Sequence, residues 1–178
     1  MAKAKPRAKA RPKSRTRSKA QSELARIAAE LERAYNGDAW HGPPMTEALK
    51  GICALSAPVK PIPEAHSIWE IVHHLTAWNH IVRRRFLGEL VMPTRDDDWP
   101  PVEGFGHEAW DAAVRSLHEA CAALISELKK AAKKRDCDMV LNKTVPGKTH
   151  SVYVMLHGAV QHNLYHTGQI SILRKAAD

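Results

Sequence analysis

Apolar residues recur every three or four positions through four long stretches of this chain. The clearest stretch runs through Trp110, Val114, Leu117, Cys121, Leu124 and Leu128. Alternating steps of four and three residues are the seam expected where helices pack in a bundle. Similar stripes predict helices over residues 21–36, 67–88 and 149–175, beside this one over 107–134. With little strand signal between them, we expect an all-α four-helix bundle.

Local signals place some of the helix ends and the connecting segments. Ser67 and Glu70 have the spacing of a capping box, in which each side chain bonds the other residue's exposed amide. The connections are expected to contain a short helix at 45–54, loops at 56–66 and 92–106, and a connector at 136–148 with a short extended piece at 139–141.

Charge divides the chain into two unequal parts. Residues 1–20 hold nine basic residues and no acidic one, whereas the rest holds 18 basic and 19 acidic residues. Because the first segment offers nothing to bury, we expect a disordered basic tail at 1–20 and one domain at 21–178. Two roles for the tail stay open: a solubilising extension, and a nonspecific, salt-dependent contact with nucleic-acid phosphates.

Composition also predicts a compartment. The three cysteines, Cys53, Cys121 and Cys137, are odd in number and lack CxxC spacing, which favours a reducing compartment over a disulfide framework. No run of 18 apolar residues occurs, so no membrane span is expected, and no apolar segment follows the basic start as in a secretory signal. We therefore expect a cytoplasmic protein.

Two of the 11 histidines, His162 and His166, lie four residues apart within the apolar stripe of the last helix, between Ala159 and Ile170. This spacing puts both rings on one helix face, where they can bind a single metal ion. His157 falls on the opposite face. A hydrogen-bonded core pair and an acid–base pair are the alternatives. Because an unsatisfied buried ring costs about 1–3 kcal/mol, a shared metal is the interpretation that we favour.

The same facing argument selects a third ligand on the helix at 67–88. His74 lies at the edge of its apolar stripe, beside Ile71 and Trp78, whereas His73 and His80 point away. The alternative for His74 is a boundary histidine that packs on Trp78.

The neighbours of the histidine pair narrow the chemistry. Asn163 stands where the HExxH motif of zinc proteases has its glutamate base, so peptidase chemistry is disfavoured. Three neutral imidazoles would leave a divalent ion with its charge uncompensated and positions open, able to ionise a thiol or water. Imidazole suits zinc, nickel, copper and iron alike. Tyr165 and Gln169 are candidates for contacts around the ligands or in a pocket.

Three segments carry a family pattern: residues 39–43 (AWHGP), 66–75 (HSIWEIVHHL) and 161–170 (QHNLYHTGQI). Together they resemble the DinB-like superfamily of small metal-binding four-helix proteins, over about residues 35–175. The resemblance implies that His74, His162 and His166 bind a divalent metal ion, zinc or nickel, and that the protein is a homodimer. The basic tail is not part of the family pattern.

The resemblance also implies a class of reaction. Some members of the family are S-transferases that use bacillithiol, mycothiol or a related low-molecular-weight thiol, and others include a maleylpyruvate isomerase. We therefore expect a metal-dependent enzyme such as a thiol S-transferase. The alternatives are a metal-dependent hydrolase, and a non-catalytic metal-binding stress-response protein whose basic tail contacts nucleic acid.

Overall fold

The computed structural model describes residues 21–177, and the predicted tail at 1–20 lies outside them. In chain order the elements are α1 (Glu23–Asn36), α2 (Met45–Leu49), α3 (Ile68–Phe86), α4 (Arg95–Asp98), α5 (Gly106–Ala132), the 3₁₀ helix η1 (Cys137–Asn142) and α6 (Val152–Ala177). Extended backbone pairs within this range only at an isolated antiparallel bridge between Thr144 and Ser151. The prediction of an all-α fold is confirmed.

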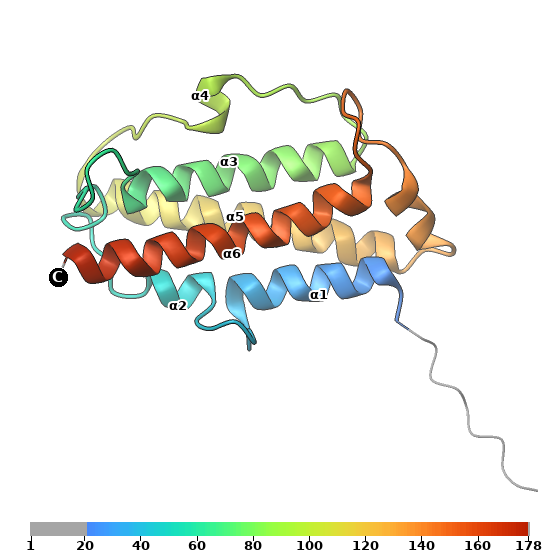
Figure 1. Ribbon diagram of the computed structural model, residues 1–178, viewed down its shortest axis with the longest axis horizontal. Coiled ribbons are helices and arrows are strands. Elements are labelled where there is room, and N and C mark those ends of the chain that lie inside the picture. Colours follow the sequence, from blue (N-terminus) through green and yellow to red (C-terminus); the bar gives the residue numbers. More distant parts are fainter. Residues whose placement is uncertain (1–20, 178) are drawn as a thin grey trace, which may run out of the picture.

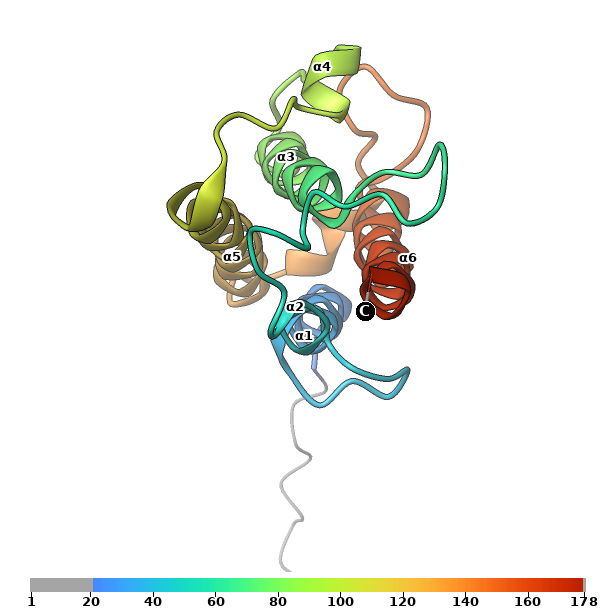
Figure 2. The same cartoon turned by 90° about the vertical axis from the view of Figure 1, so that its left-hand side faces the viewer.

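The four long helices α1, α3, α5 and α6 form the bundle. Seen end-on, they occupy four corners, with α3 diagonal to α1 and α5 diagonal to α6 (Figure 2). Helices α3 and α5 run in one direction and α1 and α6 in the other (Figure 1). The chain between α3 and α5 must therefore return along the whole bundle. This crossover connection, residues 87–105, carries α4 on the outer side of α3 (Figure 1).

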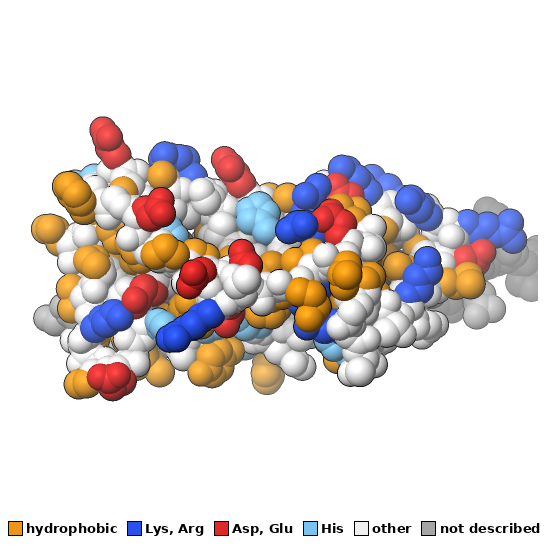
Figure 3. Space-filling view, turned by 90° about the horizontal axis from the view of Figure 1, so that it is seen from above, with side chains coloured by type: hydrophobic (Ala, Val, Ile, Leu, Met, Phe, Trp, Pro, Cys, Tyr) orange, Lys and Arg blue, Asp and Glu red, His pale blue; other side chains and the backbone are white. Residues whose placement is uncertain are grey.

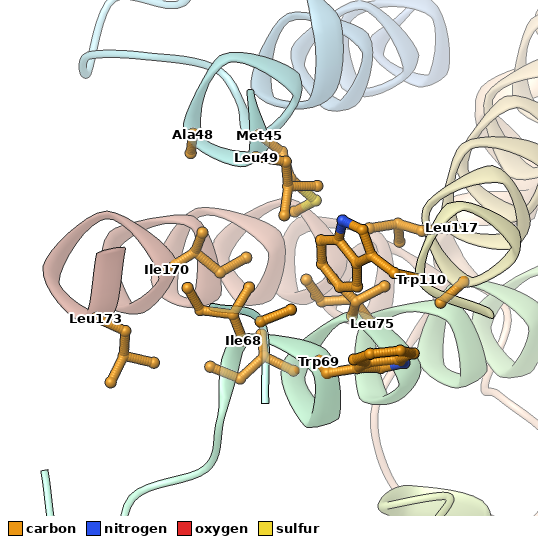
Figure 4. Close-up of a cluster of buried hydrophobic side chains, with 14 of the residues drawn as sticks. Met45, Ala48, Leu49, Ile68, Trp69, Leu75, Trp110, Leu117, Ile170 and Leu173 are labelled. Carbon is orange, nitrogen blue, oxygen red and sulfur yellow. The ribbon is translucent and has the colours of Figure 1, made fainter. Parts of the chain in front are cut away.

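The apolar stripes predicted from the sequence form the core, which has two clusters along the bundle. One cluster joins α2 to the first half of α3, the first half of α5 and the end of α6. Its centre holds Trp69 and Trp110, whose rings meet edge to face at a centroid distance of 5.4 Å (Figure 4). The other cluster joins α1 to the second half of α5 and the start of α6.

The predicted cap of α3 forms as expected. The Ser67 hydroxyl accepts a hydrogen bond from the Glu70 amide at 3.2 Å, and the Glu70 carboxylate accepts one from the Ser67 amide at 2.7 Å. These bonds satisfy two amides that the helix itself leaves without partners, so α3 starts at a defined residue. None of the helices in the described range is both long and apolar enough to cross a membrane.

Three of the expectations for the connecting segments are wrong. The helix predicted at 45–54 ends at Leu49, because Gly51 takes a left-handed backbone with φ of 84°. The piece predicted as extended at 139–141 lies within η1. There the Asp138 carboxylate accepts hydrogen bonds from the Glu23 and Leu24 amides, both at 3.0 Å, and so caps α1. The loop predicted at 92–106 contains α4.

Candidate metal centre

The structure brings together three histidines from two neighbouring helices. His74 lies in the middle of α3, and His162 and His166 lie one turn apart on α6. Their stretch of each helix falls between the two apolar clusters, in a layer of buried polar side chains. His74 and His166 are buried and His162 is half-buried. One ring nitrogen of each lies within 4.8 Å of those of the other two.

The three Nε2 atoms converge on one point. His74 Nε2 lies 2.9 Å from His162 Nε2, which lies 3.1 Å from His166 Nε2. Ligand nitrogens on metal bonds of about 2.0–2.1 Å are about 2.9 Å apart at right angles and about 3.3 Å apart in a tetrahedron. The observed separations therefore match the edges of a metal coordination sphere.

Hydrogen bonds behind two of the rings determine which nitrogens carry protons. His74 Nδ1 lies 2.6 Å from the Asp98 carbonyl oxygen, which can only accept, so this nitrogen donates. His166 Nδ1 donates to Gln169 Oε1, also at 2.6 Å, and Gln169 Nε2 donates to the Tyr165 hydroxyl at 3.0 Å. In both neutral rings Nε2 therefore carries no proton, and its lone pair faces His162. This is the arrangement in which a metal-bound histidine is oriented by its second nitrogen.

Burial keeps the three rings neutral. Burial, together with the charge that a neighbouring imidazole would carry, lowers the pKa of His162 and that of His166 to about 4. The pKa of His74 is also lowered, again mainly by burial. At neutral pH the lone pairs are therefore not competing with protons for a cation.

The crossover connection covers one side of the cluster. Trp99 stacks between two imidazoles, with centroid distances of 3.9 Å to His74 and 3.5 Å to His66. The Asp98 carboxylate accepts a hydrogen bond from the Trp78 indole at 2.6 Å and lies 3.3 Å from His74 Nδ1. Backbone and side chain of Asp98 thus both face the first ligand.

Sequence reasoning missed Asp98 and Trp99. One local signal was available, since Thr94 and Asp97 have capping-box spacing and form both of its hydrogen bonds at the start of α4. That signal could have located the short helix. It could not have shown that the connection passes over His74, because the path depends on how α3 and α5 are arranged.

The histidines that the facing argument set aside lie outside the cluster. His73 accepts a hydrogen bond from the Trp69 indole at 3.1 Å, and His80 is exposed. His157 faces α1, where its Nε2 lies 3.9 Å from the Glu23 carboxylate. The alternative for His74, packing on Trp78, describes a looser contact with a centroid distance of 6.3 Å.

A cavity of about 480 Å³ opens beside the cluster, between α3, α6 and the connection before α6. The wall of the cavity nearest the cluster is formed by His74, His162 and Asp98. Much of the remaining wall is apolar and includes Val82 and Met155. This volume lies within the range of about 300–1,000 Å³ typical of small-molecule sites. The three-histidine cluster thus faces a space that could hold a substrate.

The chain was compared with known proteins. The model of a family described as the DinB superfamily matches residues 29–170. No curated protein matches the chain, and no solved structure matches it.

Proposed function

The chain belongs to the DinB superfamily, and from that premise we propose that it binds a divalent metal ion, zinc or nickel, through His74, His162 and His166. We propose further that it is a metal-dependent enzyme, an S-transferase for a low-molecular-weight thiol. The observation that carries the metal proposal is the convergence of three Nε2 atoms, two of them with their Nδ1 protons already engaged.

Each part of the chain around the ligands has a role in this proposal. A divalent ion bound by three neutral imidazoles keeps its full charge and supplies Lewis-acid activation of a thiol or water. The Asp98 carbonyl and Gln169 orient the rings of His74 and His166. Trp99 covers one side against solvent, and the cavity on the other side leaves room for two reactants.

Two features favour a thiol over water as the activated group. The Asp98 carboxylate is engaged by the Trp78 indole, and Asn163 occupies the position of a protease's glutamate, so neither serves as a general base. A thiol has an unperturbed pKa of about 8.5 against about 15.7 for water, so it needs less help to ionise. Its sulfur would form a bond to an electrophilic carbon as the thiol proton leaves to solvent and the leaving group on that carbon departs with the electron pair of the broken bond.

Metal content tests the first part of the proposal. We expect protein purified without a histidine tag to hold one zinc or nickel ion per chain, and His162→Ala protein to hold almost none. The matched control is His157→Ala, which removes an imidazole from the same helix but outside the cluster. Equal metal content in the two variants would overturn the metal proposal.

Conjugation assays test the second part. Wild-type protein is incubated with monochlorobimane and a panel of thiols, including bacillithiol, mycothiol, glutathione and coenzyme A, before and after treatment with a chelator. We expect conjugation with at least one thiol that is lost on chelation and restored by metal. Metal binding without such conjugation would refute the transferase alone. Metal-dependent turnover of activated esters without thiol would instead identify the hydrolase.

Two further expectations stay proposals. They are homodimerisation, which the family resemblance implies, and contact between nucleic acid and the tail at 1–20, which lies outside the described residues. The second predicts DNA binding that disappears when the tail is removed and weakens steeply with salt.

A further inference from the structure

The cavity beside the three histidines contains a buried guanidinium with no acidic partner. Arg85, near the end of α3, is only 4% exposed. Its Nε and Nη2 both donate to one acceptor, the Val91 carbonyl oxygen, at 3.2 and 2.9 Å. In the part of the chain that the structure describes, no carboxylate lies within ion-pair distance of it and Nη1 has no hydrogen-bond partner.

Burial of a guanidinium without an anionic partner lowers the stability of the folded protein. A guanidinium stays protonated even where, as here, burial lowers its pKa. The carbonyl oxygen and the face of the Trp78 ring, whose centroid lies 5.7 Å from Arg85 Cζ, provide only partial negative charge, and buried cations are ordinarily paired with an anion. Since Arg85 lines the cavity, an anion that enters there would supply the missing partner.

A second unpartnered donor lines the same cavity. Asn163 is 1% exposed, and its Oδ1 accepts a hydrogen bond from Asn79 Nδ2 at 3.4 Å. Its Nδ2 is buried and has no hydrogen-bond partner among residues 21–177. Buried amide groups without partners are uncommon in folded proteins, and they often mark the place of a bound molecule.

Beside Arg85, the charged side chains that line the cavity are one lysine and one carboxylate. Lys148 and His150, from the connection before α6, line it, and no ion pair or side-chain hydrogen bond engages either within the described range. Its one acidic lining residue, Asp98, is already engaged by Trp78 and His74. The end of α3 and the start of α6 meet at one end of the bundle, and Lys and Arg side chains gather there on the surface (Figures 1 and 3).

We propose that this cavity binds a small organic carboxylate with an apolar body. The carboxylate pairs with Arg85 and Lys148, Asn163 donates a hydrogen bond to the bound molecule, and the apolar wall covers its body. The assignment of this molecule as the substrate rests on the proposed function, because it places the rest of the molecule beside the histidines. Binding of the anion itself depends on Arg85 and needs no metal.

Calorimetry on full-length, chelator-treated protein tests the inference. The probe is 4-phenylbutyrate, and the matched neutral probe is 4-phenylbutan-1-ol. We expect the acid to bind at least tenfold more tightly than the alcohol, since a charge-assisted hydrogen bond is worth about that factor or more. Equal affinities would overturn the proposal, and so would inorganic phosphate that binds as tightly as the acid, because the apolar body would then contribute nothing.

Lysine variants locate the site without disturbing a buried residue. Lys148→Gln should raise the dissociation constant of the acid about tenfold, and Lys148→Glu should abolish binding. Lys143→Gln, at an exposed position outside the cavity, is the control and should have no effect. Arg85→Gln should also abolish binding, with its fold checked by thermal unfolding. Equal effects of the Lys148→Gln and Lys143→Gln changes would refute the assignment.

The metal proposal and this inference can fail separately. His166→Ala protein should lose metal and still bind the acid, because His166 belongs to the cluster but does not line the cavity. If wild-type protein holds no metal but binds the acid through Lys148, only the proposed function is wrong. If the acid binds only after metal is restored, the metal is its anchor and the inference about Arg85 is wrong.

Discussion

The groups behind each imidazole decide how well it can hold a cation. Gln169, one turn further along α6, accepts the His166 Nδ1 proton, and its own amide nitrogen donates a hydrogen bond to the Tyr165 hydroxyl. Both residues were expected from the sequence to lie near the ligands, and their geometry supports a role in orienting His166. The role itself is a prediction that metal affinity can test.

Gln169→Ala removes the acceptor of the His166 Nδ1 proton. We expect the variant to bind metal with about 10- to 100-fold lower affinity while still reaching the same stoichiometry at saturation, because the ligand is retained but no longer oriented. Competition with a chromogenic chelator measures the affinity. Gln161→Ala, on the exposed side of the same helix, is the control. Matching affinities in the two variants would show that Gln169 does not act on the site.

The proximity of His162 and His166 could be predicted from the sequence because both lie within one element. Four residues of spacing fix the relative position of His162 and His166 once the helix is assigned. His74 was selected less firmly, since it depends on which face of a second helix turns toward the first. Asp98 and Trp99 could not be selected, because a loop has no periodicity from which its contacts can be calculated.

At the scale of elements, α4 is the helical turn of the crossover connection. Its capping box joins Thr94 and Asp97, and the helix ends at Asp98, whose carbonyl accepts the His74 proton. A cap of this kind stabilises a helix by about 1 kcal/mol. In a helix of one turn, that contribution decides whether the turn forms at all.

Thr94→Ala should therefore act on the site and not on the fold. We expect metal affinity to fall severalfold with almost no change in Tm, since α4 has no fully buried side chain. Ser67→Ala removes the equivalent cap from the core helix α3 and should give the opposite pattern, a loss of about 1 kcal/mol in unfolding free energy. Differential scanning calorimetry and chelator competition measure both quantities. A large drop in Tm for Thr94→Ala would contradict this division.

The long helices could be predicted from the sequence because the residues of their apolar stripes are the ones that pack together in the core. The short elements could not, for a physical reason that Asp138 illustrates. Its carboxylate caps α1 from 114 residues away along the chain and so fixes the conformation of η1. Local propensity carries no information about such a contact.

At the scale of the whole molecule, the buried imidazoles link stability to pH. The pKa of His162 and of His166 is about 4 in the folded chain, whereas an unfolded histidine has a pKa of about 6.5. Between these values the unfolded chain binds more protons than the folded one. The free energy of unfolding must therefore decrease as pH falls through this interval, and histidine contributes no slope above it.

Denaturant titrations of chelator-treated protein between pH 8 and pH 5 test this linkage. We expect stability to be level above about pH 7 and to decline below it, with a slope to which His162 and His166 contribute most and the smaller lowering of the His73 and His74 pKa values adds. Staying above pH 5 keeps the carboxylates of Glu70, Asp97 and Asp138, whose pKa values are lowered, ionised throughout. The double variant His162→Ala, His166→Ala should lose most of the slope. A parallel decline in wild type and variant would disprove the assignment.

The three histidines and the residues that cover them lie on different parts of the chain. The three histidines are carried by α3 and α6, whose positions the two apolar clusters hold. One wall of the site comes instead from a stretch of 19 residues that touches the core through Val91, Trp99 and Val102. Changes in length or composition that keep these contacts cost little stability. The bundle therefore keeps the three histidines in place while the surface that faces them can change with this one connection.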